Sequence, residues 1–225
     1  MIMNQFEKLP WDSEFFGFAV GKVTVSDELK NIGELLTSIP FRLLYVFSKQ
    51  NLNIESVISS KMITYGRTLE NTAYEGESEF YSDLEPMSML FNLAYISGKY
   101  SRFNVDPYIQ ETKFRELYRQ WVINSVNKSF ADEIIVRKIN DEIVGMITVK
   151  KQSERGQIGL FAVGDEFQGK GIGRDLILCG MHYLQKIGCK EVTVQTQKEN
   201  MDACRFYEKL DYKTYNEEYV YHYWN

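Results

Sequence analysis

Phe167-Gln168-Gly169-Lys170-Gly171-Ile172-Gly173 is the stretch that decides the fold, and it lies between an apolar run and a predicted helix. The apolar run, residues 158–163, is typical of a buried strand. Glycines let the backbone adopt torsions that other residues avoid and let it approach a ligand closely. A helix that begins at Gly171 or Gly173 directs free N–H groups, and the positive end of its dipole, at that ligand. The order strand, glycine loop, helix therefore predicts an anion site, most naturally for a pyrophosphate.

The loop differs from the two best-known phosphate-binding loops. A P-loop has Gly-Lys followed by Ser or Thr, whereas Lys170 is followed by Gly171. A dinucleotide-binding fingerprint has three glycines at other spacings and an acidic residue about 20 positions further on. Short glycine turns also join strands to helices without binding anything. The loop alone is therefore compatible with both a phosphate cradle and a plain turn.

A second motif follows one strand later and favours the interpretation of the loop as a phosphate cradle. It reads Asn200-Met201-Asp202-Ala203-Cys204-Arg205-Phe206-Tyr207-Glu208-Lys209-Leu210, and Asn200 is a natural N-cap for a helix over this run. Gln168-x-x-Gly171-x-Gly173 resembles the acetyl-CoA pyrophosphate signature of the GCN5-related N-acetyltransferases, the GNAT superfamily. The second motif resembles another hallmark of that superfamily. Two ordered motifs are much more specific than either alone.

The resemblance implies an α/β fold, the GNAT acyl-CoA N-acyltransferase fold with its mixed sheet covered on both faces. It also implies a division into two parts. Residues 1–98 would form an incomplete GNAT-like unit on the substrate side. Residues 99–225 would form the catalytic domain that binds acetyl-CoA.

A narrower resemblance concerns the acceptor. The opening 11–17, the stretch Ser101-Arg102-Phe103, the run 118–122 and the strand end 194–200 are similar to the TDP-fucosamine acetyltransferases of cell-surface polysaccharide biosynthesis. This similarity implies transfer of acetyl to the amine of a nucleotide-linked 4-amino-4,6-dideoxyhexose. Two alternatives stay open: an acetyltransferase for a protein N-terminus or another small amine, and a non-catalytic acetyl-CoA-binding module.

The resemblance also suggests roles for particular residues. Tyr207 is the expected general acid, because a phenol with an unperturbed pKa near 10 can protonate a leaving thiolate. On the acceptor side, Arg102 offers a planar fork for a phosphate, with Tyr100 and Phe103 as stacking surfaces; a surface ion pair of Arg102 is the alternative that stays open. The residues expected to bind acetyl-CoA come from the strand, the loop and the second motif: Phe161, Ala162, Val163, Phe167, Gln168, Gly169, Lys170, Gly171, Ile172, Gly173, Asn200, Ala203 and Phe206.

Composition excludes several classes of function. The net charge of −5 argues against a nucleic-acid-binding protein, which would carry a basic stripe. Two histidines, and three cysteines without metal-ligand spacing, predict no metal site. No stretch approaches the ~20 apolar residues that span a bilayer, and no signal peptide is indicated. We therefore expect a cytoplasmic protein that binds acetyl-CoA and a small amine, without nucleic acid or membrane, and that can form a homodimer.

The hydrophobic pattern predicts the other elements. Strands are expected at 19–25, 43–48, 63–69, 133–139, 143–150, 157–163, 191–197 and 218–224, and short helices at 29–37 and 54–61. Phe114, Leu117, Tyr118, Trp121, Val122 and Val126 form the apolar stripe of an amphipathic helix. Asn140-Asp141 predicts a hairpin turn. The acidic stretch 71–84 is expected to be a loop or an edge strand.

Overall fold

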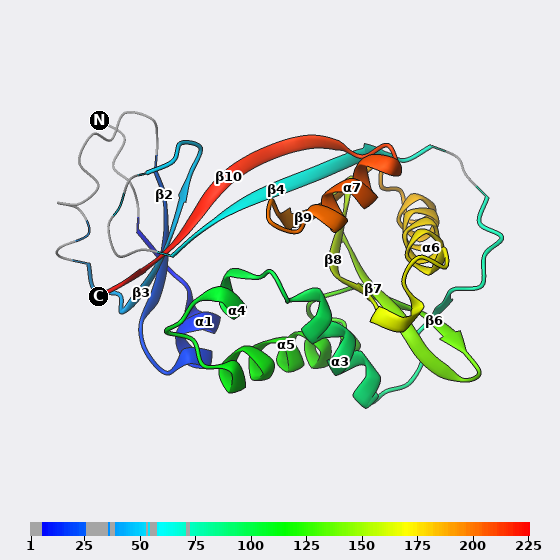
Figure 1. Ribbon diagram of the computed structural model, residues 1–225, viewed down its shortest axis with the longest axis horizontal. Coiled ribbons are helices and arrows are strands. Elements are labelled where there is room, and N and C mark those ends of the chain that lie inside the picture. The colour runs from blue at the N-terminus through cyan, green and yellow to red at the C-terminus, as the bar shows by residue number, and fades with distance from the viewer. Residues whose placement is uncertain (1–5, 26–35, 37–38, 53, 55–57, 71–72) are drawn as a thin grey trace.

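A single mixed sheet of ten strands organises the molecule (Figure 1), in the order β1-β2-β3-β10-β4-β9-β8-β7-β6-β5. The structure is a computed structural model, and it describes residues 6–25, 36, 39–52, 54, 58–70 and 73–225. The strands are β1 (Glu7–Lys8), β2 (Val20–Val25), β3 (Leu43–Ser48), β4 (Ile58–Thr68), β5 (Glu79–Phe80), β6 (Glu133–Ile139), β7 (Glu142–Gln152), β8 (Arg155–Val163), β9 (Glu191–Gln197) and β10 (Lys213–Trp224).

Helices cover both faces of this sheet. They are α1 (Pro10–Phe16), α3 (Ser88–Ser97), α4 (Arg102–Val105), α5 (Glu111–Val126), α6 (Ile172–Lys186) and α7 (Met201–Lys209), with a 3-10 turn over Asp165–Phe167. The helices α3 and α5 share one hydrophobic cluster with β6 and β7, and α6 and α7 share another with alternate residues of the same strands. We call the first side the α5 face and the second the α6 face. This arrangement confirms the predicted α/β fold with a mixed sheet.

The strand connectivity of the C-terminal half positions the glycine loop. β6, β7 and β8 are antiparallel neighbours, and β9 runs parallel to β8 after the α6 crossover. The Asn140-Asp141 turn has positive φ at both residues, as a type I′ hairpin requires. Gly188, with φ of +88°, follows the end of α6, because a residue without a Cβ adopts this left-handed conformation at little cost.

The two halves of the chain share hydrogen-bonded strands. β10, from the end of the chain, pairs with β3 on one edge and with β4 on the other, and β4 in turn pairs with β9. The proposed N-terminal unit therefore contributes a strand to the middle of the proposed catalytic half. The division at residue 98 stays a prediction.

Some predicted elements need correction. The predicted helix 54–61 is wrong over residues 58–61, which belong to β4 and pair with β10. The helix predicted at 29–37 falls outside the described residues except at Leu36. The aromatic opening 11–17 forms the helix α1, and neither α1 nor α3 is among the predicted helices. In both cases the helix is held by packing of aromatic and aliphatic side chains against the α5 face, which periodicity in a short window does not reveal.

Two features are absent from the described residues. No helix there is long and apolar enough to cross a membrane. No three His, Cys, Asp or Glu side chains there gather in a way that could hold a metal ion.

Candidate active site

The glycine loop has the backbone of an anion cradle. Gly169 and Gly171 have φ of +73° and +85°, and Gly171 is the N-cap of α6 with no side chain capping the helix. An added Cβ at either glycine would meet nothing within 4 Å, so both face open space. The first N–H groups of a helix have no intrahelical partner, and they carry the positive end of its dipole. The residues present therefore fit the pyrophosphate of acetyl-CoA.

Other loop residues hold this backbone in place. Gln168 donates from Nε2 to the carbonyl of Val163 and to Asp165, both at 3.1 Å. The Lys170 ammonium lies 5.3 Å from the centre of the Phe167 ring, and Lys170 is exposed. Its charge is thus available beside the cradle.

Gly173 lies within α6 rather than in the loop. A Cβ there would come within 3.3 Å of the Phe161 and Phe206 rings, which is tighter than ordinary contact. The sequence attributed to Gly173 the same close approach to phosphate as to Gly171. The structure shows that its missing side chain makes room for these two rings, which stack with centroids 5.5 Å apart.

β8 and β9 separate beside the β8 residues that are predicted to bind acetyl-CoA. Their parallel pairing ends at Ile158 and Val194, although β8 continues to Val163 and β9 to Gln197. The Gly164 N–H bonds back to Val144 of β7. Because N–H groups alternate along a strand, those of Phe161 and Val163 point to the edge that β9 leaves unpaired. They are therefore available as hydrogen-bond donors in the gap between the ends of β8 and β9, which we call the splay.

Tyr207 lies on α7 and is buried at 3% exposure. Its ring packs against Tyr65, Phe161, Phe206 and Tyr212. Burial raises the pKa of its phenol, so the hydroxyl keeps its proton. Within the described part of the chain no hydrogen bond engages this hydroxyl. Tyr207 is more buried than Phe206, the preceding residue of α7.

Asn200 and Ala203 form the first turn of α7. The Asn200 side chain accepts a hydrogen bond from the Ala203 N–H at 3.3 Å, which confirms the predicted N-cap. Ala203 is half-buried. Whether this turn also contacts acetyl-CoA stays a prediction.

Arg102 begins α4 on the other face of the sheet, after its N-cap Ser101. Its guanidinium carbon lies 4.8 Å from the centre of the Tyr45 ring and 4.5 Å from that of Phe103. Nη1 contacts the Met62 sulfur at 3.8 Å, and Nε is buried without a partner among the described residues. No carboxylate of the described residues lies within ion-pair distance of it. Arg102 is therefore a cation with unused hydrogen-bonding capacity.

Phe103 and Tyr100, the two expected stacking surfaces beside Arg102, differ in burial. Phe103 is buried at 5% exposure against Tyr45, Trp121 and His222, so its ring is occupied by core contacts and we assign it to the core. Tyr100 is half-buried, with the Lys99 ammonium 5.8 Å from its ring centre. Its ring has no such core role.

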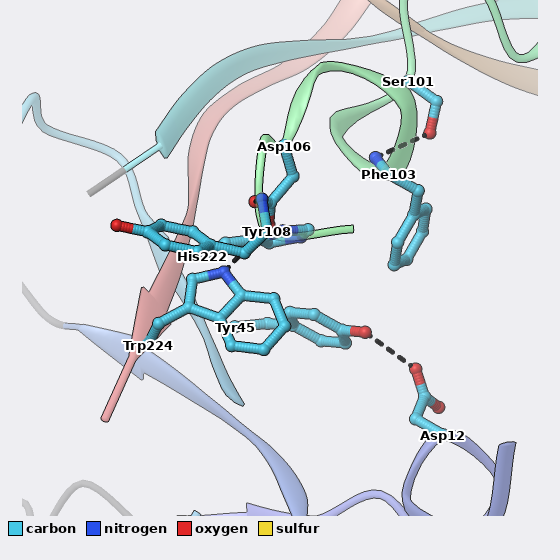
Figure 2. Close-up of polar contacts among 8 residues, drawn as sticks. All are labelled: Asp12, Tyr45, Ser101, Phe103, Asp106, Tyr108, His222 and Trp224. Atoms are coloured by element: carbon cyan, nitrogen blue, oxygen red, sulfur yellow. Dashed lines mark hydrogen bonds and ion pairs between the residues drawn. The ribbon is translucent and has the colours of Figure 1, made fainter. Parts of the chain in front are cut away.

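Figure 2 shows a buried histidine–aspartate pair, which lies near enough to Arg102 for that charge to act on the imidazole. His222 Nδ1 lies 2.6 Å from Asp106 Oδ2, which also accepts from the Trp224 indole at 3.0 Å. Burial, opposed by Asp106 and reinforced by the Arg102 charge, lowers the pKa of His222 to about 4. The imidazole is therefore neutral at neutral pH, and it donates its Nδ1 proton to Asp106. The pair joins β10 to the segment after α4.

Sequence reasoning did not point to Met62 or Glu218 as site residues. Met62 contacts Arg102, and Glu218 is the residue opposite Met62 in the β4–β10 pair. Both side chains therefore lie on the α5 face. The last strand contains three consecutive polar residues, 216–218, so its sequence does not mark one face as polar. The sequence could not say which other strands shared that face.

Comparison with known proteins agrees with this geometry. Residues 94–212 match the model of the Acetyltransferase (GNAT) family. The spore coat polysaccharide biosynthesis protein SpsD of Bacillus subtilis (strain 168) is 29% identical over 132 residues, which are 59% of this chain and 45% of SpsD. N-alpha-acetyltransferase 30 of Schizosaccharomyces pombe (strain 972 / ATCC 24843) is 26% identical over 48% of this chain and 75% of that protein. The chain thus spans less than half the length of SpsD.

Solved structures share the fold. A functionally unknown conserved protein from Staphylococcus epidermidis ATCC 12228 superposes with a TM-score of 0.60 at 16% identity, covering 100% of this chain and 93% of that one. The PaiA N-acetyltransferase of Thermoplasma acidophilum, solved with coenzyme A, has a TM-score of 0.52 at 20% identity, covering 66% and 99%. Since the family model covers more than half of the residues and includes both motifs, the chain belongs to the acetyltransferase (GNAT) family.

Proposed function

We propose that this protein transfers acetyl from acetyl-CoA to the amine of a nucleotide-linked amino sugar of the 4-amino-4,6-dideoxyhexose type. The family membership, and a relative solved with coenzyme A, support the acetyl donor. The similarity to a polysaccharide biosynthesis protein supports a sugar acceptor. The observation that carries the proposal is Arg102, a largely buried cation with a free Nε on the face opposite α6 and α7.

Different residues bind the pyrophosphate and stabilise the charge that develops during acetyl transfer. Acetyl-CoA supplies an activated acetyl group and a thiolate leaving group. Gly169, Gly171 and the first turn of α6 hold its pyrophosphate through backbone N–H groups. The N–H groups of Phe161 and Val163 donate to the oxygen that gains negative charge as the amine attacks, as in an oxyanion hole.

Tyr207 holds the proton that the leaving sulfur needs. The amine nitrogen forms the new C–N bond, the C–S bond breaks, and the phenol proton passes to the sulfur. The hydroxyl suits this step because burial keeps it protonated and no hydrogen bond within the described residues competes for it. The proton lost by the amine restores the phenol by way of solvent.

A panel of acceptors tests the proposal. We expect thiol release from acetyl-CoA with dTDP-4-amino-4,6-dideoxygalactose and not with the matching sugar nucleotide that has a hydroxyl in place of the amine. Arg102→Ala should raise the KM for the sugar nucleotide by about 10- to 100-fold, as for a lost hydrogen bond to a charged group. It should leave the KM for acetyl-CoA nearly unchanged. Equal effects on both substrates would mean that the acceptor binds elsewhere.

Arg119→Ala is the matched control for this variant. Arg119 also lies over an aromatic ring, with its guanidinium carbon 4.4 Å from the Phe91 ring centre, but it is exposed on α5. Its loss should leave both KM values unchanged. A comparable rise in the sugar-nucleotide KM for both variants would assign the effect to net charge rather than to the site.

A second candidate acceptor is a protein N-terminus. The relative N-alpha-acetyltransferase 30 favours it. A short peptide with a free N-terminal amine therefore belongs in the panel. Faster turnover of the peptide than of the sugar nucleotide would replace the first proposal by the second, and acetyl-CoA binding without thiol release from any amine would indicate a non-catalytic module.

A further inference from the structure

Three side chains from three strands lie in one row on the α5 face of the sheet. Gln197 of β9 pairs with Met62 of β4, and Met62 pairs with Glu218 of β10. Residues directly opposite each other in antiparallel strands point to the same face. Because the Met62 sulfur contacts Arg102 of α4, this row faces the acceptor side of the molecule. The row thus places Gln197 and Glu218 on the same side as Arg102.

A second polar row lies beside the first. Gln195, Thr64 and Asn216 are aligned by the same pairings, and Gln195 Nε2 donates to Thr64 Oγ1 at 3.2 Å. We call the two rows the polar floor. Elsewhere the same face consists of core residues under α3 and α5. The polar residues of the floor are half-buried or exposed, and Lys49 donates to Asn216, so a ligand could reach the remaining polar groups.

The polar floor begins at the splay. Gln195 and Gln197 are the β9 residues beyond Val194, where pairing with β8 ends. The floor therefore extends from the edge where the acetyl-CoA arm is expected, across β4, to Glu218. An acceptor amine that approaches the splay along the floor from β10 passes Glu218, which lies two strands from β9.

Glu218 is a half-buried carboxylate on this surface, and no ion pair or hydrogen bond engages it among the described residues. It is near enough to Arg102 for its charge to stabilise the guanidinium, yet the two do not form an ion pair. The neighbouring carboxylates, in contrast to Glu218, have hydrogen-bond partners. Asp12 accepts from Tyr45 at 3.1 Å, and Asp106 is engaged by His222 and Trp224.

We propose that Glu218 binds the ammonium form of the acceptor amine and accepts its proton, while Arg102 holds the anionic part of the same acceptor. This inference rests on the proposed function only in that the acceptor is an amine. One N–H bond of the ammonium breaks and its proton goes to the carboxylate, which leaves the nitrogen lone pair free to attack the acetyl carbon. The carboxylic acid then returns the proton to solvent. Over the whole reaction one proton is released for each amide formed.

Glu218→Gln tests the charge without changing the shape. We expect the KM for the acceptor to rise by about 10- to 100-fold, as for a lost hydrogen bond between charged groups. The KM for acetyl-CoA should stay at the wild-type value, because Glu218 lies on β10 and not in the glycine loop before α6. Glu218→Asp, which keeps the charge, should recover part of the acceptor affinity.

Glu217→Gln is the matched control. Glu217 is the preceding residue of β10 and points to the opposite face, where it pairs with Lys61 at 2.5 Å. Its loss should leave the acceptor KM unchanged. An unchanged acceptor KM in Glu218→Gln, or an equal rise in both variants, would overturn the assignment of Glu218.

The two proposals fail separately. The Glu218 variants are measured with whichever amine the wild-type protein acetylates, the sugar nucleotide or the peptide. If only the peptide is acetylated, the sugar-nucleotide proposal fails, while a selective rise in peptide KM for Glu218→Gln still supports the ammonium site. If the sugar nucleotide is acetylated and Glu218→Gln has no effect, only the ammonium site fails.

Discussion

Tyr207 and Tyr212 are a pair of buried phenols in the same hydrophobic cluster, with ring centroids 5.7 Å apart. Burial raises the pKa of both. The Tyr212 hydroxyl is buried without a partner among the described residues, and that of Tyr207 likewise makes no hydrogen bond there. They differ in position, because Tyr207 also contacts Phe161 of the splayed strand β8. This difference is the reason that we propose Tyr207, and not Tyr212, as the proton donor.

Tyr207→Phe should therefore lower kcat and leave acetyl-CoA affinity unchanged. Loss of a proton donor typically costs ~10²- to 10⁴-fold in rate. Steady-state thiol release gives kcat, and calorimetry gives the affinity. Tyr212→Phe removes a buried hydroxyl of the same cluster and should keep the wild-type kcat. Near wild-type turnover in Tyr207→Phe would make Tyr207 a packing residue.

His222 should make stability depend on pH. Its pKa is lowered to about 4 in the folded protein from an ordinary 6.5, because burial disfavours the charged imidazole. Above pH 6.5 neither state binds this proton. As the pH falls from 6.5 to about 4, the unfolded chain binds it and the folded protein does not, so stability decreases. Below about 4 both states bind it and this contribution becomes constant.

His222→Asn tests this dependence, because its amide nitrogen can replace Nδ1 as the donor to Asp106 but does not titrate. We expect a lower thermal midpoint at neutral pH, from lost packing, and a smaller decrease between pH 6.5 and 4 than in the wild type. Thermal denaturation across this range gives both values. Parallel curves for the two proteins would show that His222 does not titrate in this interval.

The start of α6 combines a left-handed backbone with an open surface. Gly171→Ala should lower acetyl-CoA affinity, since the new methyl group faces the space assigned to pyrophosphate. It should also cost about 1–2 kcal/mol of stability, because φ of +85° is unfavourable for a residue with a Cβ. Calorimetry and thermal denaturation measure the two effects separately.

Gly17→Ala is the control for backbone strain. Gly17 caps α1 with φ of +77°, and an added Cβ there also meets nothing within 4 Å. It should lose similar stability and keep its acetyl-CoA affinity. If both variants lose affinity equally, the loop at Gly171 is a plain turn rather than a phosphate cradle.

The shared sheet predicts how the chain folds. Without residues 1–98, β10 would lose both β3 and β4, its neighbours on either side, and β9 would lose one neighbour. Unpaired strand edges of this length favour aggregation. We expect residues 99–225 alone to show no cooperative unfolding, and co-expression with residues 1–98 to restore it. A folded 99–225 fragment that binds acetyl-CoA would show that the catalytic half is an independent domain.

Local chemistry explains what could be predicted. The glycine loop, the Asn200 cap and the Asn140-Asp141 turn each depend on a few adjacent residues, and the structure contains all three. The amphipathic helix α5 also follows its stripe, with Phe114, Leu117, Tyr118 and Val122 buried. These elements need no distant partner to be recognised.

Other elements depend on distant partners. Residues 58–61 resemble a helix locally but extend β4, because β10 pairs with them across more than 150 positions of sequence. α1 and α3 form where aromatic and aliphatic side chains meet the α5 face. Local propensity is weak compared with such tertiary packing.

The sequence by itself determined the α/β class, the glycine loop before α6, and the motif that includes Tyr207, because each is written in adjacent residues. Only the tertiary structure decided which side chains meet: that Phe103 belongs to the core, that Gly173 makes room for two rings, and that Glu218 lies on the same face as Arg102 and Gln197. The physical reason is strand pairing. Side chains alternate between the two faces, so a register that joins β10, β4 and β9 fixes the set of residues facing the acceptor, and one sequence read alone does not contain that register.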